Sequence, residues 1–154
     1  MAELTPLDEK LGEVLGLAQA AQDATKQFGG MEDAEDFDEQ LERMRAEAEE
    51  TERRTDELDG KKTAIREKAR ETKSEAVDMM KTYLAGEDEA LDGFEFLSMA
   101  EAGELCHWEI VQTMADTLSL DDVSELADWA VEIQRGHVEA VRAASLELAQ
   151  SEVG

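Results

Sequence analysis

The feature that most restricts the fold is a helical repeat of apolar residues that runs through nearly the whole chain. Its first segment shows intervals of three and four residues, at Leu7, Leu11, Val14, Ala18, Ala21, Thr25 and Phe28. This spacing puts the apolar side chains on one face of an α-helix, whereas a half-buried strand would alternate every second residue. The start signal Thr5-Pro6 and the stop signal Gly29-Gly30 predict a first helix between them.

The same repeat predicts four further helices, separated by short turns. Their expected ranges are 35–58, 61–84, 90–118 and from Ser119 to at least Leu148. Gly60 and Gly86 mark the turns on either side of the third helix. We expect Ser119 to cap the last helix, with Asp122 three residues later as a variant capping box.

Long amphipathic helices joined by short connections predict an antiparallel helix bundle. Ala, Leu, Glu and Met, all strong helix formers, dominate the composition, so the expected fold class is all-α. At 154 residues, the chain fits one domain, 1–154. Two placements of the third helix are open: a crossover between two helix pairs, or a projecting hairpin with the end of the second helix.

The charge is extreme for a chain of this size. Forty Asp and Glu residues against fifteen Lys and Arg give a formal net charge of -25. The acids occur along every predicted helix, and such self-repulsion destabilises a compact state unless salt screens it. We therefore expect a salt-tolerant host, with an ordinary acidic bacterial protein as the alternative. The charge also argues against nucleic acid and anionic membranes as partners.

Cysteine use and hydropathy indicate the compartment. Cys106 is the single cysteine, which fits a reducing environment, and we expect it to be a small buried thiol. The first residues lack the basic and apolar regions of a signal peptide, and no apolar run reaches the eighteen residues that span a membrane. These features predict a cytoplasmic protein.

Two histidines fall on apolar stripes of the last two helices. Glu104 and His107 interrupt one stripe, three residues apart, and Gln134 and His137 stand three apart on the other. A carboxylate and an imidazole at this spacing are how helical bundles present ligands to one metal ion. Glu47 on the second helix is a weaker candidate ligand. The sequence thus predicts a metal site, while catalytic residues are not indicated.

A metal-free interpretation is also open. Acids are so frequent here that one lies three residues before a given histidine by accident about one time in four, and a lone core histidine is often only hydrogen-bonded. In this alternative the same side chains form a buried polar network in a helical interaction module. The polar hairpin around residues 45–75 would then dock a partner or form a dimer arm.

The residues from Met99 to Ile133 resemble the ferritin-like bacterial stress proteins of the YciE/YciF type. His107-Trp108-Glu109-Ile110 matches that family's His-aromatic-Glu-Ile stretch, and the turn before Ala64 is similar as well. The resemblance implies a ferritin-like four-helix bundle with an additional middle helix and a tendency to dimerise. It further implies iron or a similar transition metal in the core and a stress or peroxide-handling role.

The chain departs from the family pattern at three places. Cys106 replaces an acid before the histidine, Ala18 stands where the first helix should carry an inward glutamate, and Gln134 and His137 replace an acid-rich pair. The resemblance therefore implies a metal centre that is rearranged, mononuclear or lost.

Overall fold

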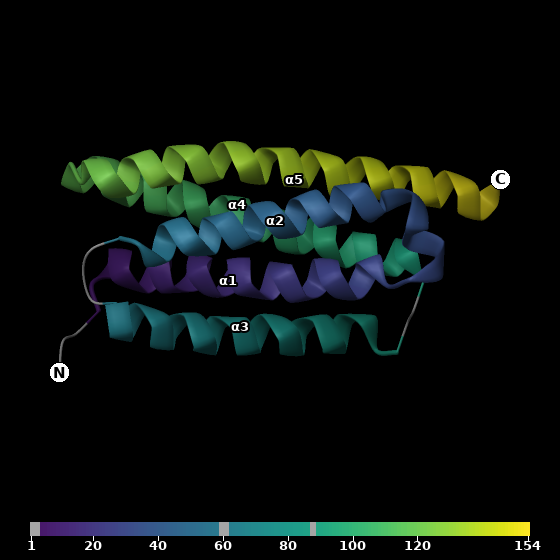
Figure 1. Cartoon of the computed structure of the whole chain (residues 1–154), viewed down its shortest axis with the longest axis horizontal. Coiled ribbons are helices and arrows are strands. Elements are labelled where there is room, and N and C mark those ends of the chain that lie inside the picture. Colours follow the sequence, from purple (N-terminus) through teal and green to yellow (C-terminus); the bar gives the residue numbers. More distant parts are fainter. Residues whose placement is uncertain (1–3, 59–61, 87–88) are drawn as a thin grey trace.

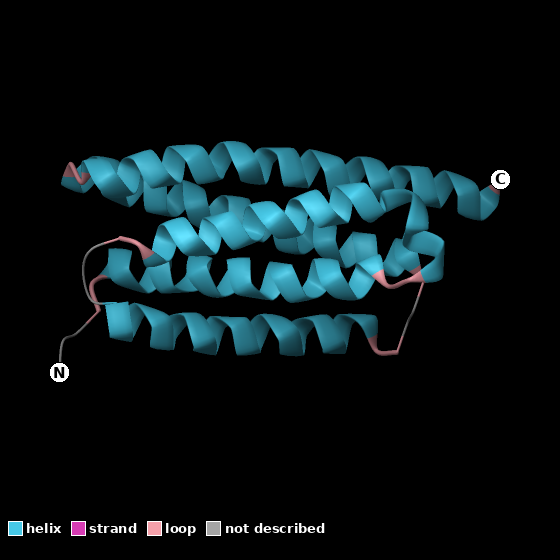
Figure 2. Ribbon diagram, in the orientation of Figure 1, coloured by secondary structure: helices cyan, strands magenta, loops and turns pink. Residues whose placement is uncertain are grey.

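The computed structural model describes residues 4–58, 62–86 and 89–154. Its elements are α1 (Pro6–Gly29), the short 3-10 helix η1 (Glu32–Phe37), α2 (Asp38–Asp56), α3 (Lys62–Leu84), α4 (Ala90–Leu118) and α5 (Asp121–Val153). The described ranges contain no strand, so the predicted all-α class is confirmed (Figure 2).

The ends of α1 follow the predicted signals. The Thr5 hydroxyl accepts a hydrogen bond from the Asp8 backbone N–H, and the Asp8 carboxylate accepts one from the Thr5 N–H, both at 3.1 Å. This capping box satisfies two of the backbone donors that a helix start leaves unpaired. The helix ends at Gly29, as the Gly-Gly signal predicts.

The other boundaries agree less closely. The predicted cap at Ser119 is wrong: this residue has a left-handed backbone (φ 56°) that ends α4, and α5 begins at Asp121 after Leu120. The second helix enters through η1 before α2 begins at Asp38. The turns predicted around Gly60 and after Gly86 lie wholly or partly outside the described residues.

The long helices lie side by side, with α1 at the centre (Figure 1). Helix α1 packs against α2, α3 and α4, while α4 and α5 form the most extensive pair and α2 also reaches α5. Helices α1, α3 and α5 run in one direction and α2 and α4 in the other (Figure 1). Helix α3 lies along the outer side of α1 and returns the chain to the start of α4, so the crossover placement is correct and the projecting hairpin is wrong.

Two glycines let α3 approach α1 closely. A Cβ built on Gly16 would lie 2.4 Å from the carbonyl oxygen of Ala69 and 2.9 Å from the Cβ of Thr72. A Cβ on Gly12 would lie 2.6 Å from the Cβ of Lys68. Any side chain at these positions would overlap the facing helix, so the pairing of α1 with α3 depends on glycine.

The core consists of two apolar clusters. One, near the α1–α2 turn, is built around the buried aromatic rings of Phe28 and Phe94, with Leu41, Met44 and Val141. The other, near the start of α1, is built around buried Trp108, with Leu11, Val14, Val111 and Ala130. On α4 and α5, the residues between these clusters are polar and nevertheless buried.

Candidate functional site

A layer of buried polar side chains crosses the middle of the bundle. Its members are Glu101 and Glu104 on α4, Gln134 and His137 on α5, and Glu47 on α2. The first four are only 2–4% exposed, whereas the Glu47 side chain is 29% exposed at the edge. We call these five residues the polar layer. Because it lies between the two apolar clusters, it is held by packing on both sides.

Glu101 is the hub of the polar layer. Its Oε2 accepts a hydrogen bond of 2.8 Å from the Gln134 amide nitrogen and lies 3.5 Å from His137 Nδ1. His137 Nε2 lies 3.3 Å from Glu47 Oε1 on the other side of the ring. Both ring nitrogens thus face carboxylate oxygens, which suits an imidazolium that can donate from each.

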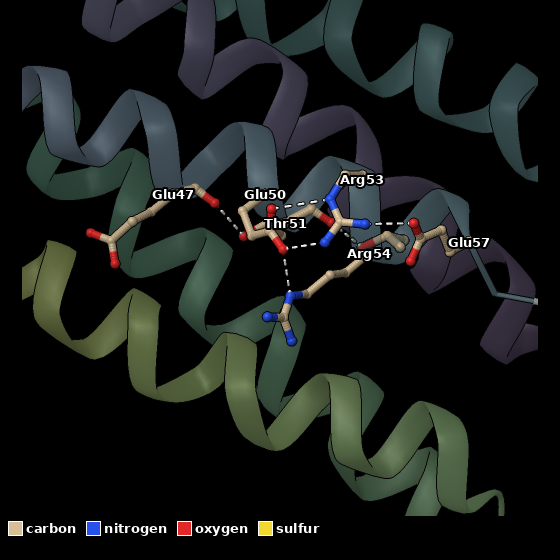
Figure 3. A network of polar contacts seen from close by, with 7 residues as sticks. Glu47, Glu50, Thr51, Arg53, Arg54 and Glu57 are labelled. Carbon is tan, nitrogen blue, oxygen red and sulfur yellow. Dashed lines mark hydrogen bonds and ion pairs between the residues drawn. The ribbon is translucent and has the colours of Figure 1, made fainter.

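Glu47 joins the layer from the edge of a surface ion-pair network on α2 (Figure 3). In that network Arg53 pairs with Glu50 and Glu57, and Arg54 also pairs with Glu50. The carboxylate of Glu47 points away from these arginines (Figure 3). Its ion-pair partners are therefore His137, at 3.3 Å, and Arg43, at 3.7 Å.

The electrostatics of the layer favour two bound protons. Burial, and then the charge of Glu101, raise the pKa of Glu104 well above its usual range. Burial alone would lower the pKa of His137, but hydrogen bonds and attraction to Glu101 and Glu47 outweigh it and raise the pKa. The layer therefore favours a neutral Glu104 carboxyl and a cationic His137 between two carboxylates.

His107 lies apart from the polar layer. Its Nε2 is 3.0 Å from Glu13 Oε2 and its Nδ1 is 2.8 Å from the Gly103 carbonyl oxygen, while Lys10 Nζ lies 2.9 Å from the same Glu13 oxygen. The His107 side chain is 34% exposed. The expectation that both Glu104 and His107 lie in the core is therefore correct for Glu104 and wrong for His107.

His107 lies apart because the inward face of α4 differs from the predicted one by one residue at several levels, including Glu101 in place of Ala100 and Trp108 in place of His107. The apolar spacing on either side of Glu104 and His107 predicts an inward face that consists of Leu97, Ala100, Glu104, His107, Val111, Met114 and Leu118. The buried stripe in the structure is Leu97, Glu101, Glu104, Trp108, Val111 and Ala115. Burial of the Trp108 ring selects this stripe, and it carries Glu101 inward with Glu104. The signal that sequence reasoning missed was a second glutamate three residues before Glu104, in register with Leu97 and Trp108.

The donor atoms of the layer fit a transition metal in kind. Carboxylate oxygens with one imidazole nitrogen suit iron, manganese or zinc. As the side chains stand, no group of three His, Cys, Asp or Glu in the described ranges converges on one point. Glu47 and Glu101 lie on opposite sides of the His137 ring. Glu101 Oε2 and His137 Nδ1 lie 3.5 Å apart, and Glu104 is buried close enough to Glu101 for the charge of Glu101 to raise its pKa.

Other predicted residues lie at the surface. Cys106 is exposed, so the expected buried thiol is wrong. Glu109, the glutamate of the His-aromatic-Glu-Ile stretch, lies 3.9 Å from Arg135 and is also exposed. Ala18 is fully buried on α1 and adds no ligand there. None of the helices in the described ranges is both long and apolar enough to cross a membrane.

No family of known proteins, no curated protein and no solved structure matches the chain.

Proposed function

We propose that the polar layer binds a single transition-metal ion, iron or manganese, in a ferritin-like bundle. The observation that carries this is the burial of Glu101 and Glu104, 2% and 4% exposed, next to each other at mid-bundle. In the described ranges neither pairs with Lys or Arg, and only His137 lies at ion-pair distance from Glu101. Two carboxyl groups so placed cost stability unless a cation or proton compensates them.

The bound protons suggest how a cation would be accommodated. Raised pKa values on Glu104 and His137 favour one proton on each. A divalent ion that displaced both would leave the charge of the layer unchanged, and metal ligands must be deprotonated to bind. Metal binding would thus replace two protons by one divalent ion and leave the net charge of the core the same.

The residues would take distinct parts in holding the ion. Glu101, Glu104 and His137 Nδ1 would be the ligands, and Glu47 would accept a hydrogen bond from His137 Nε2 on the other side of the ring and so orient it. The Gln134 amide, which donates to Glu101, would orient that carboxylate as a supporting hydrogen bond. The fully buried Ala18 on α1 adds no oxygen ligand, which favours one ion over two.

The direction of the helices supports the ferritin-like part of this proposal. An antiparallel pair, α1 and α2, is joined through the crossover helix α3 to a second antiparallel pair, α4 and α5 (Figure 1). Ferritin-like bundles have one such long crossover connection. Bound iron would supply redox chemistry with oxygen or peroxide, in a stress or iron-handling role.

The test is metal content by elemental mass spectrometry, on protein purified in high salt without chelator and then loaded anaerobically with ferrous ion. We expect about one ion per chain, lost when Glu101 and Glu104 are both replaced by Gln. The matched control is His107→Ala, because this histidine lies outside the layer and its loss should leave the metal content unchanged. If His107→Ala lost the metal and the variant with both glutamates replaced by Gln kept it, this ligand assignment would be refuted.

A metal-free helical module is the second candidate, favoured because Glu101 Oε2 already has two protein partners, the Gln134 amide at 2.8 Å and His137 Nδ1 at 3.5 Å. It predicts no bound metal after ferrous loading and no thermal shift on adding metal. A ligand at about 100 times its dissociation constant should instead stabilise the fold by roughly 2.7 kcal/mol. That is about 5–10 °C for a domain of this size.

A further inference from the structure

A groove of about 830 Å³ runs between α3 and α4, with α1 beneath it. Its apolar lining includes Leu17, Ala76, Phe96 and Ala100. Helices α3 and α4 touch little, because α3 packs mainly on α1. The groove is therefore a consequence of the crossover helix, and Glu104 is the member of the polar layer that also lines it.

Exposed apolar side chains collect along this groove. Met79 is 67% exposed, Met99 53% and Tyr83 45%, and all three line it. They are three of the seven large apolar side chains that are exposed in the described ranges. The Tyr83 ring also packs against that of Phe96, with ring centroids 5.7 Å apart and the ring planes tilted by 47°. Flexible methionine side chains on the walls of an open apolar groove are typical of surfaces that bind amphipathic helices.

Charge indicates what kind of helix would fit. Glu13, Glu75 and Asp78 line the same groove, and the chain as a whole carries a net charge of -25. Lys68 and His107 are the basic side chains at one end. A second copy of this chain would bring an equally negative surface, which disfavours it as the occupant. A cationic partner would be attracted both by the whole molecule and by the acids in the groove.

We propose that this groove binds a basic amphipathic helix of a partner protein. The apolar face of the partner helix lies between Met79 and Met99, and its Lys or Arg side chains pair with Glu75 and Asp78. The wall of α3 from residue 72 to residue 83 is roughly 17 Å long, which accommodates about three turns of a helix. The apolar groove fixes the position of the helix and the acids select its charge.

The experiment uses a fluorescent 18-residue peptide of Leu and Lys, arranged as an amphipathic helix, titrated into the full chain and followed by anisotropy. The reference is a peptide of the same composition in scrambled order, which keeps the charge and loses the apolar face. We expect saturable binding of the amphipathic peptide at one site per chain, at least tenfold tighter than the scrambled one. Equal binding of the two peptides would show attraction by charge alone and overturn the proposal.

Matched variants locate the site. Met79→Gln with Met99→Gln removes two exposed apolar side chains from the groove, so the fold should tolerate it while peptide affinity falls at least tenfold. Leu118→Gln with Leu146→Gln removes two side chains of similar exposure, 59% and 58%, outside the groove and should change affinity less than twofold. A groove occupied by a second copy would appear in sedimentation as a dimer that Met79→Gln with Met99→Gln dissociates, and that result would also overturn the proposal.

Discussion

The close pairing of α1 with α3 gives the sharpest test of the fold, through Gly16→Ala. A Cβ at this position would lie 2.4 Å from the Ala69 carbonyl oxygen, whereas ordinary contact begins near 3.4 Å. The carbonyl would have to retreat by 3.4 minus 2.4, or 1.0 Å. Since this oxygen belongs to the backbone of α3, no side-chain rotation relieves the overlap and the helix itself must move.

The magnitude follows from two opposed effects. Alanine in place of glycine inside a helix stabilises it by roughly 1 kcal/mol. Forcing extra atoms into a close-packed interface costs typically about 1–3 kcal/mol, and backbone overlap belongs at the upper end. We therefore expect Gly16→Ala to lower the free energy of unfolding by about 1–2 kcal/mol. Gly12→Ala should lose slightly less, because its closest contact, with the Lys68 Cβ at 2.6 Å, is longer than the 2.4 Å at Gly16, although that Cβ is also fixed to the α3 backbone.

The matched control is Gly136→Ala on α5, where a new Cβ would meet nothing within 4 Å. This variant should gain about 0.5–1 kcal/mol, through helix propensity and a less flexible unfolded chain. Urea unfolding followed by circular dichroism at constant high salt measures both variants, and their midpoints should move in opposite directions. If the Gly16→Ala variant proved as stable as the Gly136→Ala variant, α3 would not lie this close to α1.

Three further changes probe the polar layer and the first helix. Because burial raises the pKa of Glu104, the stability that its protonated form supplies is present below its ordinary value of 4.5 and lost as pH rises through the raised one. The side chain that Glu104→Gln introduces cannot titrate. In urea unfolding, the variant should have the same free energy of unfolding as wild type near pH 4.5 and a higher one at higher pH, by up to about 1.4 kcal/mol per pH unit within that window. Parallel pH profiles of the two proteins would contradict this. Replacing Glu101 and Glu104 together by Met should raise the thermal midpoint of metal-free protein, since apolar residues of similar volume often gain about 1–4 kcal/mol over buried charges, and a lower midpoint would argue for a structural network. Thr5→Ala should cost about 1 kcal/mol through loss of the helix cap, measured by urea unfolding, and no loss would mean that water replaces the Thr5 hydroxyl.

The helices were predictable because their signals are local. The apolar repeat, the Thr5 cap and the Gly29 stop each act within a few residues, and the structure agrees with them. The position of α3 was not predictable, since a crossover and a projecting hairpin share one amphipathic pattern. What decides between them is the close contact of Gly16 with Ala69, more than fifty residues away, which no local pattern reveals.

The polar layer was predictable only in part, for a related reason. His137, Gln134 and Glu104 interrupt apolar stripes and were visible as exceptions, and Glu47 was named as a weaker candidate. Glu101 was hidden because acids occupy 40 of 154 positions, so one more glutamate carries no signal. Its burial follows from Trp108, whose ring turns α4 by one residue relative to the face drawn through Ala100 and His107.

Among the many acids of this chain, the buried glutamates of the polar layer differ from those at the surface. On the surface, a glutamate of this chain needs no explanation beyond solvation. Most ion pairs in the described ranges join residues three or four apart on one helix, such as Arg53 with Glu50 and Glu57. Such exposed pairs contribute little to stability. Glu101 and Glu104 differ, because both are almost fully removed from water and divide one apolar core into two. A bundle selected for stability alone would fill this level with leucine or methionine, so the cost of burying two carboxyl groups favours a functional reason for the layer.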